Sequence, residues 1–203
     1  MTFAIFAIDM HKTQLTMKRI LSLIAIVFVS CTMMFGQGHL KIKNIPIDGT
    51  VQSMYAKLKA TGLKPIPEVS GALQGTFAGM NDCAFLIIGS EKTNTVYKVG
   101  VMSQFEDSWY SLKSLYLRLK EQYTNKYNEC QSFEFFSSPY YEGDGYEMLA
   151  LRLDKCTYAS YFETPEGIIS IEIKEKYIFI TYEDAINLEK AKAELNESVN
   201  SDI

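Results

Sequence analysis

The chain has 203 residues, of which 47% are hydrophobic and 22% are charged, as in an ordinary globular protein with a sizeable apolar core. This composition excludes an intrinsically disordered chain, which combines low hydrophobicity with a high net charge, because the net charge here is only −4. Nucleic acid is not an expected partner, since the chain has no Lys/Arg cluster interleaved with aromatic residues.

The N-terminal segment has the features of a secretory leader. Met17, Lys18 and Arg19 form a basic start, and the apolar run 20–29 follows. That run is shorter than the roughly 20 residues that a membrane-spanning helix needs. We therefore predict that the true start is Met17, that a signal peptide is cleaved after Gln37, and that the protein is exported to the periplasm or the cell surface.

A lipid anchor is the alternative to a cleaved leader. Cys31 follows the apolar run, as a lipoprotein acceptor would, but Phe28 stands where the usual motif has Leu. We expect membrane attachment only if Cys31 is lipidated. The chain then divides into a leader (1–37), a first half (38–128) and a second half (129–203), the two halves forming one compact domain.

The two halves of the expected domain differ in charge. Residues 38–126 carry 11 basic and 7 acidic side chains, whereas residues 127–203 carry 6 basic and 16 acidic side chains. Two interpretations stay open: solvated surface with some attraction between the halves, or an acidic face for a basic partner.

The first half predicts two helices and a meander of strands. Thr50 is a suitable N-cap, apolar residues follow it at spacings of three and four, and Gly62 ends the helix. The expected elements are a strand at 38–45, a helix at 50–62, strands at 66–69, 73–80, 83–89 and 95–104, and a helix at 107–127. The single tryptophan, Trp109, opens the second helix and is expected to pack in the core.

The second half repeats this pattern with more aromatic residues. Its expected elements are strands at 132–137, 145–153, 156–163, 168–174 and 177–182, and a helix at 184–198. The fold class is α+β, with antiparallel meander sheets and helices packed on one face. Aligning Cys83 with Cys156 suggests two similar ββ(β)α halves, although antiparallel meanders also resemble one another by chance.

The sequence contains few groups that carry catalysis. His11 lies in the leader and His39 lies two residues after the expected cleavage, so we expect a folded part without imidazole. Ser-His-Asp and Cys-His arrangements and His-based zinc sites are then excluded. No glycine-rich phosphate-binding loop follows a strand. We predict no catalytic residue, no cofactor and no metal.

Three cysteines remain after the leader. A hairpin centred near Gly143 would place Cys130 opposite Cys156, and in an oxidising compartment this predicts a structural disulfide between them. Cys83 is then a buried thiol in an apolar strand.

The candidate binding site is the expected hairpin tip around Gly143. Its binding residues are Tyr140, Tyr141, Glu142, Asp144 and Tyr146. Such a segment is also typical of an ordinary turn, so three readings stay open: a turn alone, a surface for a protein or glycan partner, or a calcium site formed by Glu142, Asp144 and Glu147.

Three short stretches of the chain resemble segments of a known group of proteins. They are Ile45-Pro46-Ile47-Asp48-Gly49-Thr50, Phe77-Ala78-Gly79 and Val96-Tyr97-Lys98-Val99. Over residues 40–105 the chain resembles a group of uncharacterised exported proteins of gut-type bacteria. The resemblance implies no activity.

The leading expectation is an exported, non-catalytic binding protein that presents its acidic, tyrosine-rich second half to a partner. Two alternatives are a histidine-independent hydrolase that uses paired carboxylates, and a structural subunit of an envelope assembly. The sequence does not determine the oligomeric state.

Overall fold

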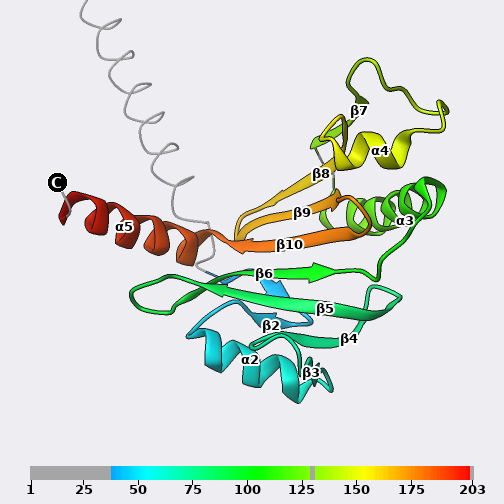
Figure 1. Ribbon diagram of the computed structural model, residues 1–203. Helices are drawn as coiled ribbons and strands as arrows, with labels where there is room; N and C mark the ends of the chain where they lie inside the picture. Colours follow the sequence, from blue (N-terminus) through cyan, green and yellow to red (C-terminus); the bar gives the residue numbers. More distant parts are fainter. Residues whose placement is uncertain (1–37, 129–130, 202–203) are drawn as a thin grey trace, which may run out of the picture. The chain divides into compact units, whose positions relative to one another are not determined.

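The computed structural model describes residues 38–128 and 131–201 (Figure 1). Its framework is an eight-stranded antiparallel sheet with the order β3-β4-β5-β6-β10-β9-β8-β7. The strands are β3 (Lys64–Pro65), β4 (Leu73–Phe77), β5 (Met80–Gly89), β6 (Val96–Met102), β7 (Gln131–Phe136), β8 (Cys156–Thr164), β9 (Gly167–Ile173) and β10 (Ile178–Asp184). A separate hairpin contains β1 (Lys41–Ile42) and β2 (Ile45–Pro46). The helices are α2 (Val51–Ala60), α3 (Trp109–Tyr127), α4 (Glu147–Arg152) and α5 (Ala185–Ser201).

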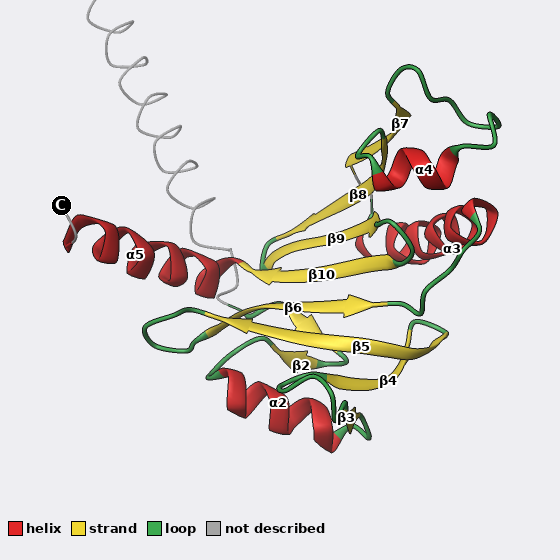
Figure 2. Ribbon diagram, viewed as in Figure 1, coloured by secondary structure: helices red, strands yellow, loops and turns green. Residues whose placement is uncertain are grey.

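The strand order reads as two meanders joined at their last strands. β3 to β6 run in sequence order from one edge, β7 to β10 run in from the other, and β6 pairs with β10 in the middle. A helix follows each meander, α3 after β6 and α5 after β10. The α+β class with an antiparallel sheet and packed helices is therefore confirmed (Figure 2).

The arrangement of the strands corrects the alignment of Cys83 with Cys156. In this order β5 occupies the place that β9 has in the second meander, whereas Cys156 begins β8. The helices also cross between the halves: α3 follows β6 but packs on β8, β9 and β10, and α5 follows β10 and contacts β6. α2 packs on β4 and β5.

One face of the sheet forms the core. Residues directly opposite each other in an antiparallel sheet share a face, and the row Phe85, Val101, Ile180, Ile171 is fully buried. Side chains from α2 and α3 belong to the same cluster, as do residues of the β1–β2 hairpin. The opposite face carries the ion pair between Lys98 and Glu183, as expected for a solvated sheet surface.

Several predicted strands differ from the structure. The strands predicted at 73–80 and 83–89 instead meet at a turn of residues 78–79, since β4 ends at Phe77 and β5 begins at Met80. Residues 147–152 form α4, because Glu-Met-Leu-Ala-Leu-Arg consists of strong helix formers. Residues 66–69 form a turn after the short strand β3. Residues 38–45 contain the first arm and the turn of the β1–β2 hairpin, because Lys43 and Asn44 take positive φ angles of 50° and 64°, as a two-residue hairpin turn requires.

The described helices include none that is both long and apolar enough to cross a membrane.

Candidate functional site

The predicted binding residues lie between β7 and α4. We call residues 140–147, which end at the first residue of α4, the tyrosine loop. Carboxylates of the loop bind its own backbone. Asp144 accepts hydrogen bonds from the backbone N–H of Tyr141 at 3.1 Å and of Tyr146 at 2.7 Å. Glu147 accepts one from the N–H of Gly143 at 2.8 Å. Because Gly143 and Gly145 have φ angles of 88° and 77°, glycine suits both positions. The loop is therefore held in one conformation by its own polar groups.

Glu142 fastens the loop to the body of the protein. It forms an ion pair with Lys113 of α3 and accepts a hydrogen bond at 3.2 Å from the hydroxyl of Tyr158 on β8. The hydrogen bond from Lys113 is the main cause that lowers the pKa of the Glu142 carboxyl, so this side chain is ionised at neutral pH. Lys113 also lies 5.7 Å from the centre of the Tyr158 ring. This carboxylate anchors the loop to two elements of the fold.

Aromatic rings pack around Tyr158, the residue whose hydroxyl binds the loop. The ring of Trp109 lies 5.4 Å from that of Phe136 and 5.0 Å from that of Tyr158, and Tyr116 lies 5.7 Å from Tyr158. All three pairs are edge-on, the favoured geometry for neighbouring rings. Trp109 packs against the core, as predicted. Its indole N–H is buried and has no hydrogen-bond partner of normal geometry within the described part of the chain.

The structure divides the five predicted binding residues into two groups. Tyr141 and Tyr146 are exposed, at 64% and 60%. Tyr140 packs against the core, and Glu142 and Asp144 are engaged in holding the loop. Only the two exposed phenol rings are free to contact a partner.

Sequence reasoning missed a third exposed tyrosine. Tyr110 is 80% exposed and lies three residues before Lys113 on α3, which places both side chains on one face of the helix. Since Lys113 binds Glu142, Tyr110 belongs to the surroundings of the tyrosine loop. The sequence shows that Tyr110 and Lys113 are three residues apart. This spacing indicates a place near the tyrosine loop only once Glu142 is known to bind Lys113.

The loop does not gather its carboxylates into a metal site. Glu142, Asp144 and Glu147 each bind a different donor. Over residues 38–128 and 131–201, no group of three or more His, Cys, Asp or Glu side chains is placed to hold a metal ion.

The geometric basis for the predicted disulfide is wrong. It assumed a hairpin centred near Gly143, but residues 147–152 are helical and β7 pairs with β8, which places Cys156 opposite Phe136. Cys130 lies outside the described residues. Cys156 and Cys83 are both buried, and neither forms a disulfide within the part of the chain that the structure describes. Burial raises the pKa of the Cys83 thiol to about 11 and that of Cys156 to about 12, so both stay protonated at neutral pH.

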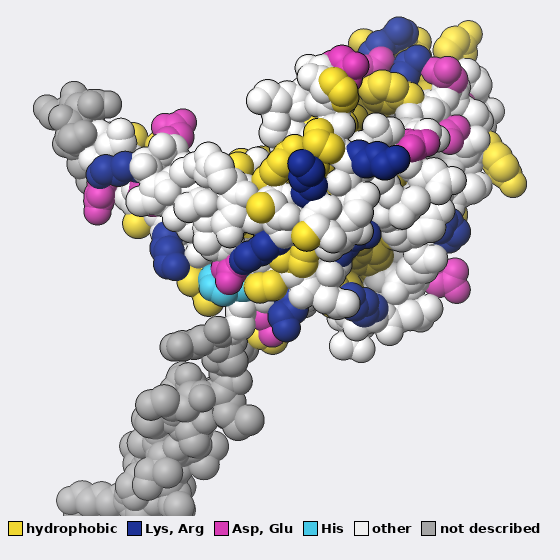
Figure 3. Space-filling view, turned by 90° about the horizontal axis from the view of Figure 1, so that it is seen from below, with side chains coloured by type: hydrophobic (Ala, Val, Ile, Leu, Met, Phe, Trp, Pro, Cys, Tyr) yellow, Lys and Arg dark blue, Asp and Glu magenta, His cyan; other side chains and the backbone are white. Residues whose placement is uncertain are grey.

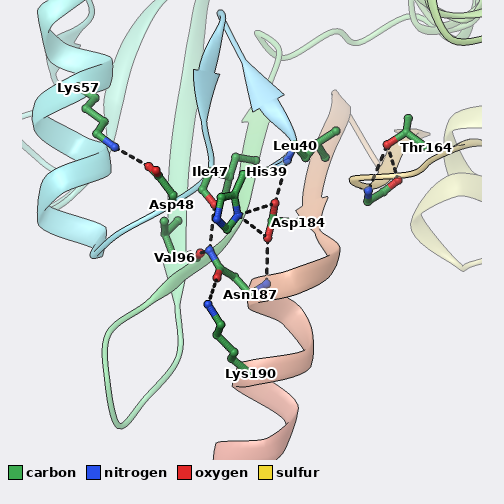
Figure 4. Close-up of polar contacts among 11 residues, drawn as sticks. His39, Leu40, Ile47, Asp48, Lys57, Val96, Thr164, Asp184, Asn187 and Lys190 are labelled. Atoms are coloured by element: carbon green, nitrogen blue, oxygen red, sulfur yellow. Dashed lines mark hydrogen bonds and ion pairs between the residues drawn. The ribbon is translucent and has the colours of Figure 1, made fainter. Parts of the chain in front are cut away.

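The expectation of a folded part without imidazole is also wrong. His39 belongs to the described domain, and its Nδ1 lies 3.1 Å from both carboxylate oxygens of Asp184 (Figure 4). Asp184 is fully buried and also accepts hydrogen bonds from the backbone N–H of Leu40 at 2.8 Å and of Asn187 at 2.9 Å. These contacts join the segment before β1 to the start of α5.

No family model, curated protein or solved structure matches the chain. The resemblance of residues 40–105 to exported proteins of gut-type bacteria therefore stays a prediction, and function has to be inferred from the geometry of the sites.

Proposed function

We propose that this protein is an exported, non-catalytic binding protein that contacts a partner protein through the tyrosine loop. One observation carries the proposal: the loop is fixed by hydrogen bonds from its backbone N–H groups to Asp144 and Glu147 and by the anchor Glu142, yet it leaves Tyr141 and Tyr146 exposed. A contact surface that is already ordered loses little conformational entropy on binding.

Tyrosine rings suit this role. A phenol ring offers a large apolar surface and a hydroxyl group while having few rotatable bonds, and tyrosine is enriched among the residues that dominate binding energies at protein interfaces. Tyr110 adds a third exposed ring on a rigid helix. These rings therefore favour a protein as the partner over a glycan. The crosslinking experiment described below distinguishes the two.

Export is part of the proposal and rests on the sequence of the leader. Expression of the full chain in a Gram-negative host should yield a periplasmic or surface form that begins near Gly38. Mass spectrometry of the purified protein measures the N-terminus. An unprocessed protein recovered from the cytoplasm would contradict export.

Photo-crosslinking in cells tests the binding surface. A benzophenone amino acid would replace Tyr141 or Tyr146 in separate strains, with Phe105, which is 68% exposed and lies outside the loop, as the control position. We expect one protein to be captured from both loop positions and not from the control. Capture of carbohydrate alone would favour a glycan ligand, and equal capture from all three positions would refute a specific surface.

A further inference from the structure

A second candidate site lies away from the tyrosine loop. A cavity of about 800 Å³ opens between the β1–β2 hairpin, the C-terminal end of α3 and the turn between β8 and β9, and we call it the β1–β2 cavity. Its walls come from four segments, within residues 38–44, 77–78, 122–128 and 163–166, and from Tyr182, although Ile42, Thr124 and Asn125 do not line it. A cavity of this size can enclose a small molecule.

Two paired phenols line the cavity. The hydroxyl oxygens of Tyr123 and Tyr182 lie 2.5 Å apart, and both residues are buried. Burial raises the pKa of both hydroxyls, so both keep their protons at neutral pH. Since one proton occupies the bond between the two oxygens, the other is left to donate. The described residues provide no further partner for it, which leaves a donor for an oxygen atom of a ligand.

Three lysines surround the cavity without carboxylate partners in the described part of the chain. Lys43 donates to the backbone carbonyl of Thr76 at 3.3 Å, and Lys126 lies 4.8 Å from the ring centre of Tyr127. Lys41 is exposed. In Figure 3 the histidine side chain, in cyan, lies on a face where basic and acidic side chains are close together.

Two glutamates complete the wall. Glu163 lies near the end of β8 and Glu166 in the turn between β8 and β9, and neither forms an ion pair within residues 38–128 and 131–201. Glu166 lies beside Gly38, since a Cβ atom added to that glycine would stand 3.6 Å from Glu166 Cγ. Lys43 instead lies beside Thr76 of β4. The cavity thus presents unpaired charges of both signs from different elements.

Two residues of the wall take unusual backbone conformations. Lys43 has a φ angle of 50° and Ala78 one of 48°, in the left-handed region that normally favours glycine, asparagine or aspartate. Strain of this kind costs on the order of 1 kcal/mol per residue and is often found at ligand-binding sites. Here both residues lie at hairpin turns that border the same cavity.

We propose that the β1–β2 cavity binds a small zwitterion of the amino-acid or short-peptide class. Its carboxylate would contact Lys43, Lys126 and the free phenol proton, and its ammonium group would contact Glu163 and Glu166. The rings of Phe77 and Tyr127 provide apolar surface for a side chain.

The charge pattern favours a zwitterion over other small ligands. A cation would be repelled by the three lysines, and an anion without a cationic group would leave the two glutamates without partners. A neutral sugar would leave both sets of charges without partners, and such unpaired polar groups lower affinity.

Isothermal titration of the purified domain with alanyl-phenylalanine tests the ligand class. The matched ligands are the same dipeptide N-acetylated, the same dipeptide C-amidated, and maltose. We expect the free dipeptide to bind and each blocked form to bind about tenfold more weakly or worse, as the loss of one charge-assisted hydrogen bond implies. The proposal would be refuted if the blocked dipeptides or maltose bound as tightly as the free dipeptide. It would also be refuted if the free dipeptide did not bind at millimolar concentration.

Variants of the cavity residues test which side chains contact each end of the ligand. Lys126→Gln should weaken the free dipeptide but not the C-amidated form, and Glu166→Gln should weaken the free dipeptide but not the N-acetylated form. Lys59→Gln and Glu68→Gln, at exposed sites outside the cavity, are the controls. Equal losses for free and blocked ligands would show that the substitutions act on folding instead. A Tyr141→Ala variant should bind the dipeptide normally, which separates this proposal from that for the tyrosine loop.

Discussion

Asn187 joins three parts of the chain through one buried amide. Its side-chain N–H groups donate to the backbone carbonyls of Ile47 and Val96, both at 2.9 Å (Figure 4). Asn187→Ala should lower the free energy of unfolding by about 2–3 kcal/mol, because it leaves two buried carbonyls without donors. Urea denaturation measures this. Asn196→Ala, at an exposed position of α5, should change stability by less than about 0.5 kcal/mol; similar effects of both substitutions would contradict the assigned role.

The paired hydroxyls of Tyr123 and Tyr182 should behave as a unit. Either single substitution by Phe leaves one buried hydroxyl without its partner and should cost about 1–2 kcal/mol of stability. The double variant removes both polar groups, so its cost should be smaller than the sum of the single costs. A double-mutant cycle by urea denaturation measures the coupling, and strictly additive effects would show that the hydroxyls do not interact.

Caps and turns explain why many elements were predictable. The hydroxyl of Thr50 accepts a hydrogen bond from the N–H of Ser53, and Asp184 accepts one from the N–H of Asn187, as expected of N-cap residues. Both helix starts were expected from local sequence. The strand predicted at residues 145–153 failed because alternation of apolar residues over a short run does not distinguish a strand from a helix.

Gly167 marks the tight turn between β8 and β9. Its φ angle is 155°, and an added Cβ atom would lie 2.0 Å from the backbone oxygen of Glu183. Gly167→Ala should therefore destabilise the protein by about 3 kcal/mol or more, because neighbouring backbone must move. Gly71→Ala is the matched control, since Gly71 has a φ angle of 81° but open space around it, and should cost only about 1–2 kcal/mol. Thermal unfolding compares the two, and equal losses would refute the steric argument.

At the scale of the whole molecule, contacts distant in sequence decide the sites. The tyrosine loop could be found from composition, but the role of Glu142 could not, because its partner Lys113 lies on another element. The β1–β2 cavity could not be found at all, since its walls come from four separate segments and Tyr182. Local sequence predicts strands and caps, whereas these sites depend on tertiary packing.

The buried thiols make stability depend on pH. Burial raises the pKa of Cys83 from 9.0 to about 11 and that of Cys156 from 9.0 to about 12. Above pH 9 the unfolded chain loses these protons while the folded protein keeps them, so the free energy of unfolding should fall as the pH rises from 9 towards 11. Urea denaturation at pH 8 and pH 10 measures the fall. Cys156→Ala should show a smaller fall than the wild type, and an identical pH dependence would contradict this assignment.

The central claim is that the protein binds a partner through exposed tyrosines on a preformed loop. Its most direct test is a titration of the crosslinked partner, once purified, with the wild type, with the Tyr141→Ala/Tyr146→Ala double variant and with Phe105→Ala. If both rings dominate the contact, the double variant should bind at least about a hundredfold more weakly, while Phe105→Ala binds as the wild type does. Wild-type affinity in the double variant would contradict the claim.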